Sequence, residues 1–108
     1  MSAEPAEPEI DPERIEVQHE PALSRYTVWL DDRNVGLLDY VTTGRGIRFT
    51  HSEIDPSERH QGLASVLTEY ALNDVRTRTD LPVVAACPYV ADWIDEHAEY
   101  QDLLTRGR

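Results

Sequence analysis

Residues 58–64, ERHQGLA, place arginine, histidine, glutamine and glycine directly before a segment with helical spacing. Within them Arg59, Gly62 and Ala64 follow the pattern Arg-x-x-Gly-x-Ala. A helix N-terminus offers unpaired backbone N–H groups and roughly half a positive charge. Gly62 would let a ligand approach the backbone, and Ala64 would keep the next turn narrow. This combination indicates an anion-binding site of the kind that holds phosphate groups. Ser57 is a possible cap for the helix.

Four further side chains could take part in proton transfer or covalent catalysis, namely His51, Glu53, Cys87 and Tyr89. Histidine and glutamate serve as bases, cysteine as a nucleophile or base, and tyrosine as an acid. Each has a simpler alternative: a lone cysteine can be a small buried apolar residue, and a strand histidine can belong to the core. Tyr89 could equally serve only for packing. The spacing of histidines and carboxylates does not match a metal site, and we predict no metal.

The elements that must position these residues begin with alternating segments. Short polar or glycine-containing gaps separate them, at 31–34 and between Gly44 and Gly46. Such spacing is typical of an antiparallel meander. In the third segment Val35, Leu37 and Val41 are in phase, so we expect them to share one face. The four predicted strands are 14–20, 24–31, 35–43 and 47–55.

The fourth predicted strand changes its phase. Ile47, Phe49 and His51 lie on odd positions, whereas Ile54 lies on the opposite phase. A one-residue bulge near 51–53 would return Ile54 toward the core. Alternatively, Ile54 faces a second layer. We expect His51 to share the face of Phe49, close to the end of the strand.

An amphipathic helix and a second helix follow the strands. Apolar residues recur at three- and four-residue steps and predict a buried stripe; they are Leu63, Val66, Leu67, Tyr70, Ala71 and Val75. Residues 81–86 are a compact apolar run, which we interpret as a buried strand parallel to the fourth. Pro88 permits a second helix, with Val90, Trp93, Ile94 and His97 on its apolar face and a docking tail through residue 104. The predicted fold class is α+β, in the order β-β-β-β-α-β-α.

Composition narrows the classes of partner. The chain has 21 acidic and 10 basic residues and a net charge of −11, and every basic residue is arginine. Such a surface repels nucleic acid, and it also suits a high-salt cytoplasm, where screening relieves self-repulsion. No apolar run approaches the roughly 20 residues of a membrane span. We expect a cytoplasmic protein with a mobile acidic segment at 1–13 and one domain at 14–108.

Two blocks of the sequence resemble a known family. Arg59-x-x-Gly62-x-Ala64 is similar to the pyrophosphate-binding signature of the GNAT N-acetyltransferase superfamily. HSEIDPSERHQGLASVLTEYAL and VVAACPYVADWIDEHAEYQDLL resemble the corresponding blocks of a subgroup of compact, single-domain predicted acetyltransferases. The resemblance covers residues 47–104. It departs at His60, where a glycine is frequent, and at Ala98, which replaces a proline.

The resemblance implies a minimal GNAT fold, a mostly antiparallel mixed sheet that splays open after its fourth strand. Acetyl-CoA would enter the splay, with Ile54 and Asp55 beside its pantetheine arm. Its pyrophosphate would be surrounded, largely through backbone N–H groups, by Arg59, His60, Gln61, Gly62, Leu63 and Ala64. Only residues 21–23 separate the first two strands, so the acceptor side should be open.

The implied activity is transfer of an acetyl group from acetyl-CoA to an unidentified amine, either a small molecule or a protein. Cys87, His51, Glu53 and Tyr89 are the candidates for the chemical step. Two alternatives remain open: a module that binds acetyl-CoA or CoA without turnover, and an acidic protein-interaction domain. We expect a monomer or weak homodimer that binds neither nucleic acid nor membranes.

Overall fold

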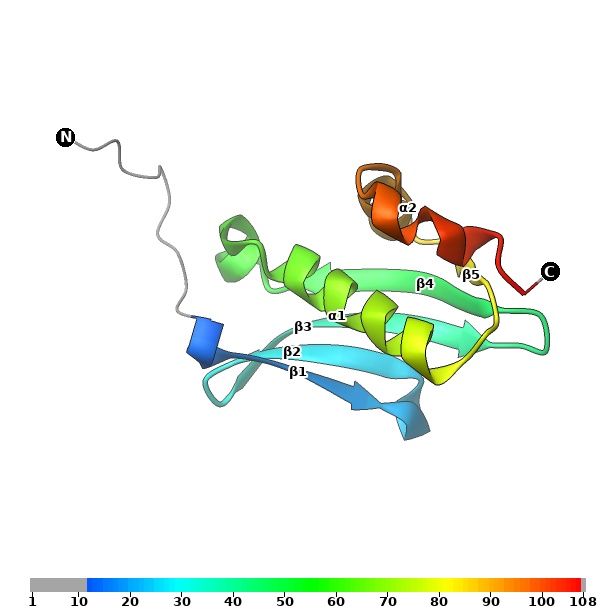
Figure 1. Ribbon diagram of the computed structural model, residues 1–108. Coiled ribbons are helices and arrows are strands. Elements are labelled where there is room, and N and C mark those ends of the chain that lie inside the picture. The colour runs from blue at the N-terminus through cyan, green and yellow to red at the C-terminus, as the bar shows by residue number, and fades with distance from the viewer. Residues whose placement is uncertain (1–11, 108) are drawn as a thin grey trace.

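The computed structural model describes residues 12–107, so most of the segment expected to be mobile lies outside the described residues. Its centre is a sheet in which the strands follow their sequence order (Figure 1). Neighbours from β1 to β4 pair antiparallel, and β5 pairs parallel with β4. This arrangement confirms the predicted α+β fold class and strand order. The strands are β1 (Ile15–Glu20), β2 (Arg25–Leu30), β3 (Arg33–Thr42), β4 (Ile47–Ile54) and β5 (Val83–Ala85).

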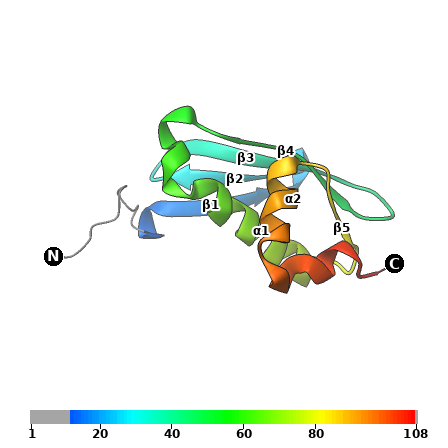
Figure 2. The ribbon, with the colours of Figure 1, turned by 90° about the horizontal axis from the view of Figure 1, so that it is seen from above.

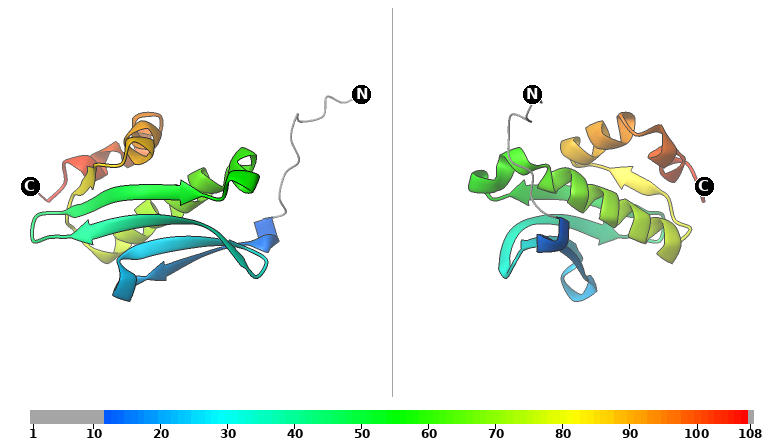
Figure 3. Two further views of the ribbon diagram at one scale, coloured as in Figure 1. Left: turned by 180° about the vertical axis from the view of Figure 1, so that it is seen from behind. Right: turned by 60° about the vertical axis from the view of Figure 1, so that its left-hand side comes forward.

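Two α-helices of the described chain, α1 (Leu63–Arg78) and α2 (Pro88–Asp95), cover one face of the sheet (Figure 2). Within residues 12–107, the opposite face of β1–β4 carries no helix, as the view from behind shows (Figure 3). Only a short 3-10 helix, η2 (Pro21–Leu23), connects β1 to β2. Longer 3-10 segments are η3 (Pro56–Gln61), between β4 and α1, and η4 (Ala98–Leu104), after α2.

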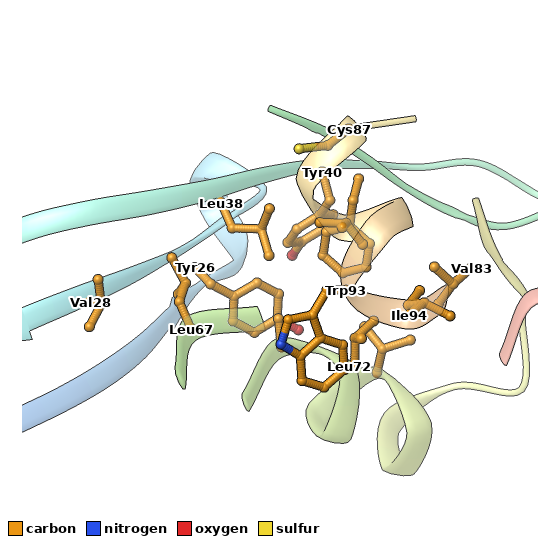
Figure 4. Close-up of a cluster of buried hydrophobic side chains, with 14 of the residues drawn as sticks. Tyr26, Val28, Leu38, Tyr40, Leu67, Leu72, Val83, Cys87, Trp93 and Ile94 are labelled. Atoms are coloured by element: carbon orange, nitrogen blue, oxygen red, sulfur yellow. The ribbon is translucent and has the colours of Figure 1, made fainter. Parts of the chain in front are cut away.

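The core lies between the sheet and the two helices (Figure 4). Tyr26, Leu38 and Phe49 are fully buried from the sheet side, and Leu67 and Leu72 meet them from α1. The helix α2 joins the same cluster through three buried side chains, Val90, Trp93 and Ile94. Burial of large apolar side chains on this face explains why both helices pack there.

A bulge in β3 overturns the predicted facing of that strand. Val28 pairs with Gly36 and Trp29 pairs with Asn34, so Val35 is an extra residue. The alternation shifts after it, and Leu38 and Tyr40 face the core. The expectation that Val35, Leu37 and Val41 share one face is therefore wrong, because Val35 is buried while Val41 is exposed. An extra residue reverses every later side chain in a strand.

A second bulge occurs in β4, one residue before the predicted position. Tyr40 pairs with Phe49 and Asp39 pairs with His51, so Thr50 is the extra residue. Ile54 packs against the core as the predicted bulge requires. Because the phase has changed before His51, this histidine is exposed and does not share the buried face of Phe49. The prediction for His51 is therefore wrong.

The parallel strand β5 is shorter than the predicted 81–86. It pairs with β4 only up to Phe49 and Ala85, followed by one bond from the N–H of Cys87 to the carbonyl of Phe49 at 2.8 Å. Beyond that point β4 continues to Ile54 against β3 alone. The two parallel strands therefore part after Phe49, which confirms the predicted splay.

The buried face of α1 differs in part from the predicted stripe. Val66 and Tyr70 are 37% and 45% exposed, whereas Thr68 and Leu72 are buried. The core-facing side of α1 therefore includes residues 67, 68, 71, 72 and 75. Val66 and Tyr70, at the other edge of the predicted stripe, face outward. At its C-terminal end, Arg106 donates to the carbonyls of Val75 and Arg76 at 3.1 and 3.3 Å. This contact supplies partners for carbonyls that a helix end leaves free.

The predicted second helix ends earlier than its apolar pattern indicates. The helix α2 stops at Asp95, so His97 lies outside it. The ring of His97 stacks on Trp93 at 3.7 Å between centroids, and its Nδ1 lies 2.6 Å from the Trp93 carbonyl oxygen. These contacts give His97 a packing role beside Trp93.

Candidate functional site

The segment 58–64 joins a 3-10 helix to α1. Asp55, just after β4, caps η3: its Oδ1 accepts from the N–H and the hydroxyl of Ser57 at 3.0 and 2.9 Å. The expectation that Ser57 caps the long helix is therefore wrong, because its hydroxyl serves η3. The backbone of 59–61 completes η3, and α1 begins after Gly62.

Gly62 has two reasons to be glycine. Its backbone lies in the left-handed region, with φ 73° and ψ 13°, where an L-residue is strained by about 1–2 kcal/mol. A Cβ built on it would meet no atom within 4 Å. The backbone conformation therefore favours glycine, and the space beside it is open to an approaching group.

The first turn of α1 begins without a side-chain cap. The first helical bond runs from the N–H of Val66 to the carbonyl of Gly62 at 3.2 Å, so the N–H groups of 63–65 precede the helical ladder. Leu63 contributes only its backbone here because its side chain is buried in the core. Ala64 is half-buried and keeps this turn narrow.

Arg33 anchors η3 from the other side. Its Nη2 donates to Glu58 Oε2 at 2.6 Å, and its Nη1 donates to Asp55 Oδ2 at 3.4 Å. Bonds from Ser57, and then the charge of Arg33, hold the pKa of Asp55 below its ordinary value. Sequence reasoning missed Arg33, since more than twenty residues separate it from its partners and no local pattern links them.

Cys87 lies at the wall of the splay. It is 4% exposed and occupies the N-cap position of α2. Its Sγ is 3.5 Å from the hydroxyl of Ser52 on β4. Among the residues that the structure describes, this is the one polar side-chain contact of the sulfur. Sequence reasoning missed Ser52, because only the bulge at Thr50 turns it toward Cys87.

Two more of the catalytic candidates, His51 and Glu53, lie on the opposite face of β4. His51 Nε2 is 2.7 Å from Glu53 Oε2, and both side chains are more than half exposed. Since His51 and Glu53 alternate with Ser52 along the strand, they point away from Cys87. The structure thus brings His51 and Glu53 together and leaves Cys87 across the sheet from them.

The splay, the glycine at the start of α1 and the sheet order together point to one family. Residues 25–103 match the family model described as GCN5-related N-acetyl-transferase. The chain belongs to this family. No curated protein matches the chain. Membership of the GNAT family supports acyltransferase activity in general, and the family uses acetyl-CoA.

Tyr89 lies in the first turn of α2 of the GNAT domain and is partly exposed. Burial, and then the negative charge of Glu96, raise the pKa of Tyr89, although a hydrogen bond with Ser65 acts in the opposite direction. The phenol therefore keeps its proton at neutral pH. Trp93 Nε1 donates to the Ser65 hydroxyl at 2.8 Å and ties α2 to the first turn of α1.

Over residues 12–107, none of the helices is both long and apolar enough to cross a membrane. Within the same range, His, Cys, Asp and Glu side chains do not gather in threes as a metal-ligand group.

Proposed function

We propose that this GNAT domain transfers the acetyl group of acetyl-CoA to an amine. The observation that carries the proposal is the end of β4–β5 pairing at Phe49, while β4 runs on to Ile54. From there β4 and the chain that follows β5 no longer pair, although Ser52 still contacts Cys87. The open glycine at the start of α1 follows β4 through a single 3-10 helix. A ligand with an extended amide chain and a polyphosphate fits both features.

The donor would bind through backbone groups. Residues 51–54 pair with β3 but have no β5 partner, so their outer edge suits the amides of the pantetheine arm, in the manner of an added strand. Ile54 and Asp55 would flank this arm. The pyrophosphate would lie on the first turn of α1, where N–H groups and the helix dipole favour an anion. Arg59, His60, Gln61, Gly62, Leu63 and Ala64 would form this cradle.

The acceptor would approach over the helix-free face of the sheet. There Glu53 can accept from the Nε2–H of His51, which leaves His51 Nδ1 as the proton acceptor. The amine nitrogen attacks the acetyl carbonyl carbon, the C–N bond forms and the C–S bond breaks. The proton of the amine passes to His51 Nδ1. With only η2 between β1 and β2, a bulky acceptor has access.

The CoA thiolate leaves and needs a proton. Tyr89 supplies it in this proposal, because the raised pKa keeps its phenol protonated. Cys87 lines the splay beside Ser52 as a buried packing residue. A cysteine nucleophile is usually activated by a neighbouring base or positive charge, and the contact of this sulfur is a neutral hydroxyl. We therefore favour direct transfer over an acetyl-cysteine intermediate.

The proposal also covers the acceptor, the cellular location, the oligomeric state and the partners of the protein. The acceptor is an amine of a small molecule or a protein. The protein acts in the cytoplasm as a monomer or weak homodimer, and it binds neither nucleic acid nor membranes. The net charge of −11 supports the exclusion of nucleic acid, because duplex binding depends on basic contacts to phosphates.

The first test is calorimetric titration of acetyl-CoA at low and at molar KCl. Binding should also raise the unfolding free energy by ~2.7 kcal/mol at a hundredfold excess over the dissociation constant. Arg59→Glu and Gly62→Glu should each weaken binding, whereas Arg45→Glu, in the β3–β4 turn, should leave it unchanged. Binding without acetyl loss to any amine would identify a silent CoA-binding module. Absence of binding by folded protein would favour an interaction domain.

A further inference from the structure

A second polar site lies at the C-terminal end of α1. His19 from β1, Tyr26 from β2, Tyr40 from β3, and Asp74 and Arg78 from α1 form one hydrogen-bonded cluster. Next to it is a cavity of about 210 Å³. The apolar part of its wall is Ile47, Val75 and Leu81, and the polar part includes Tyr40, Thr42 and Arg78. Sequence reasoning found no role for His19, because its partners come from three other elements.

The directions of the hydrogen bonds in this cluster follow from Arg78. A guanidinium only donates, so His19 Nδ1, 2.5 Å from Arg78 Nη2, must accept. Burial, and then Arg78, lower the pKa of His19, although Asp74 acts in the opposite direction. A neutral His19 with an accepting Nδ1 carries its hydrogen on Nε2. That hydrogen is therefore donated to the Tyr40 hydroxyl oxygen, 2.5 Å away.

Tyr40 is left with a hydrogen to donate. Its oxygen accepts from His19, and burial is the largest cause of a raised pKa that keeps the phenol protonated. Within residues 12–107, the Tyr40 hydroxyl has no second hydrogen-bond partner. The neighbouring Tyr26 hydroxyl is already committed, since it donates to Asp74 Oδ2 at 2.6 Å. Tyr40 therefore offers a donor at the wall of the cavity.

Arg78 offers further donors beside the same cavity. Its contacts with Asp74, His19 and Tyr26 all run through Nη2. Over the described part of the chain, its Nε and Nη1 take part in none of these bonds. Apart from the hydroxyls of Thr42 and Thr79, the free polar groups at this wall are donors, and their complement is an acceptor that can take two bonds. A carboxylate matches a guanidinium because its two oxygens can accept two parallel hydrogen bonds.

We propose that this cavity binds a small organic carboxylate, whose acid group accepts from Arg78 and Tyr40 and whose short apolar chain packs on Ile47, Val75 and Leu81. A fully hydrated inorganic anion would leave the apolar wall in contact with water. A ligand with an apolar chain therefore fits this cavity better. Asp74 holds Arg78 in place and balances part of its charge, so selectivity rests on the arrangement of donors rather than on net charge.

This site is separate from the proposed acetyl-CoA cradle. The helix α1 has 16 residues and therefore spans about 24 Å at its usual rise. Gly62 precedes its first residue, and Arg78 is its last. Binding of a carboxylate here can succeed or fail independently of acetyl-CoA binding.

The test uses hexanoate and hexan-1-ol, which share an apolar chain and differ in the acid group. Calorimetry of the full chain should give hexanoate about tenfold tighter binding than hexan-1-ol. Arg78→Gln should remove this preference, whereas Arg76→Gln, which affects the pair with Asp102, should retain it. Thr42→Trp, at the exposed rim, should block both ligands and leave the fold intact by circular dichroism.

Other results would overturn the proposal. Equal affinity for the acid and the alcohol would remove the role of the donors. Hexanoate binding that survives Thr42→Trp in a folded protein would place it elsewhere. Absence of hexanoate binding to the wild-type chain would show that the cavity does not select carboxylates. Because Thr42 is exposed, the Thr42→Trp variant tests the site even if Arg78→Gln fails to fold.

Discussion

Arg33 and Glu58, 25 residues apart in the chain, form an ion pair at 2.6 Å. The contact ties the start of β3 to η3, which carries Arg59, His60 and Gln61. Glu58 is buried, with an 11% exposed side chain, whereas Arg33 is half exposed. Because Arg33 belongs to β3, the pair holds the segment that leads into α1 through a contact with a different element. A glutamate that looks like one more surface acid in the sequence has a positioning role.

Arg33→Gln should loosen η3 and weaken acetyl-CoA binding about tenfold, because the cradle would lose its preorganised position. The loss of unfolding free energy should be modest, about 1 kcal/mol, since solvent screens the exposed guanidinium. Arg33→Lys should restore part of the affinity. The matched control is Arg45→Gln in the β3–β4 turn. Unchanged affinity in Arg33→Gln would show that the pair does not position the cradle.

Gly62→Ala should lower the unfolding free energy by about 1–2 kcal/mol, because alanine is strained at positive φ. The new methyl group meets no atom within 4 Å, so its effect on the fold is confined to the backbone. Gly44→Ala is the control, since that glycine also has open surroundings but no positive φ. Urea denaturation of both variants measures the difference. Equal costs at the two positions would contradict the strain argument.

His51→Gln should reduce the turnover number about a hundredfold, in the usual range for a general base, while the affinity for acetyl-CoA stays unchanged. Glu53→Gln should reduce it less, because Glu53 acts through the imidazole. Steady-state kinetics with an accepted amine, alongside calorimetry, separate binding from chemistry. A loss of affinity equal to the loss of rate would point to a damaged donor site instead.

Cys87→Ala should keep turnover and give no change in the intact mass after incubation with acetyl-CoA. The buried thiol packs against Ser52 in this arrangement, so the expected cost is one of stability, about 1 kcal/mol. Ser52→Ala serves as the matched change on the facing strand. An acetyl adduct on the wild-type protein that disappears in Cys87→Ala would replace direct transfer by a covalent route.

His19 should make the protein less stable as the pH falls. Burial, and then Arg78, lower its folded-state pKa below 6.5, so the unfolded chain takes up the proton first. The stability that depends on neutral His19 is fully present above pH 6.5 and is lost as the pH falls toward the folded-state pKa. His19→Gln keeps an acceptor and a donor but does not titrate.

Melting temperatures of wild type and His19→Gln should therefore converge or cross between about pH 7.5 and pH 5. The other titrating groups are common to both proteins and cancel in the comparison. A constant difference across this range would show that His19 has the same pKa in the folded and unfolded chains.

Potassium chloride should stabilise the protein. The net charge of −11 without any lysine causes self-repulsion, which ions screen over about 3 Å at 1 M salt. The melting temperature should rise between dilute buffer and about 1 M KCl. Sucrose at matched water activity is a control for excluded solutes. No rise in KCl would argue against adaptation to a high-salt cytoplasm.

The sequence alone determined the order of the elements and the parallel fifth strand, and it is the origin of the proposal that 59–64 binds an anion. These features depend on local periodicity, on turn residues and on a helix following a strand, all of which neighbouring residues encode. The bulge in the fourth strand was also predictable within one residue, because Phe49 and Ile54 lie on opposite phases.

Only the tertiary structure decided which side chains meet. The extra residues Val35 and Thr50 reverse the faces of β3 and β4, so Ser52 rather than His51 faces Cys87. A bulge forms where pairing with the neighbouring strand requires it, and a single strand does not contain that information. The same holds for Arg33 with Glu58 and for His19 with Arg78, whose contacts exist only after distant segments pack.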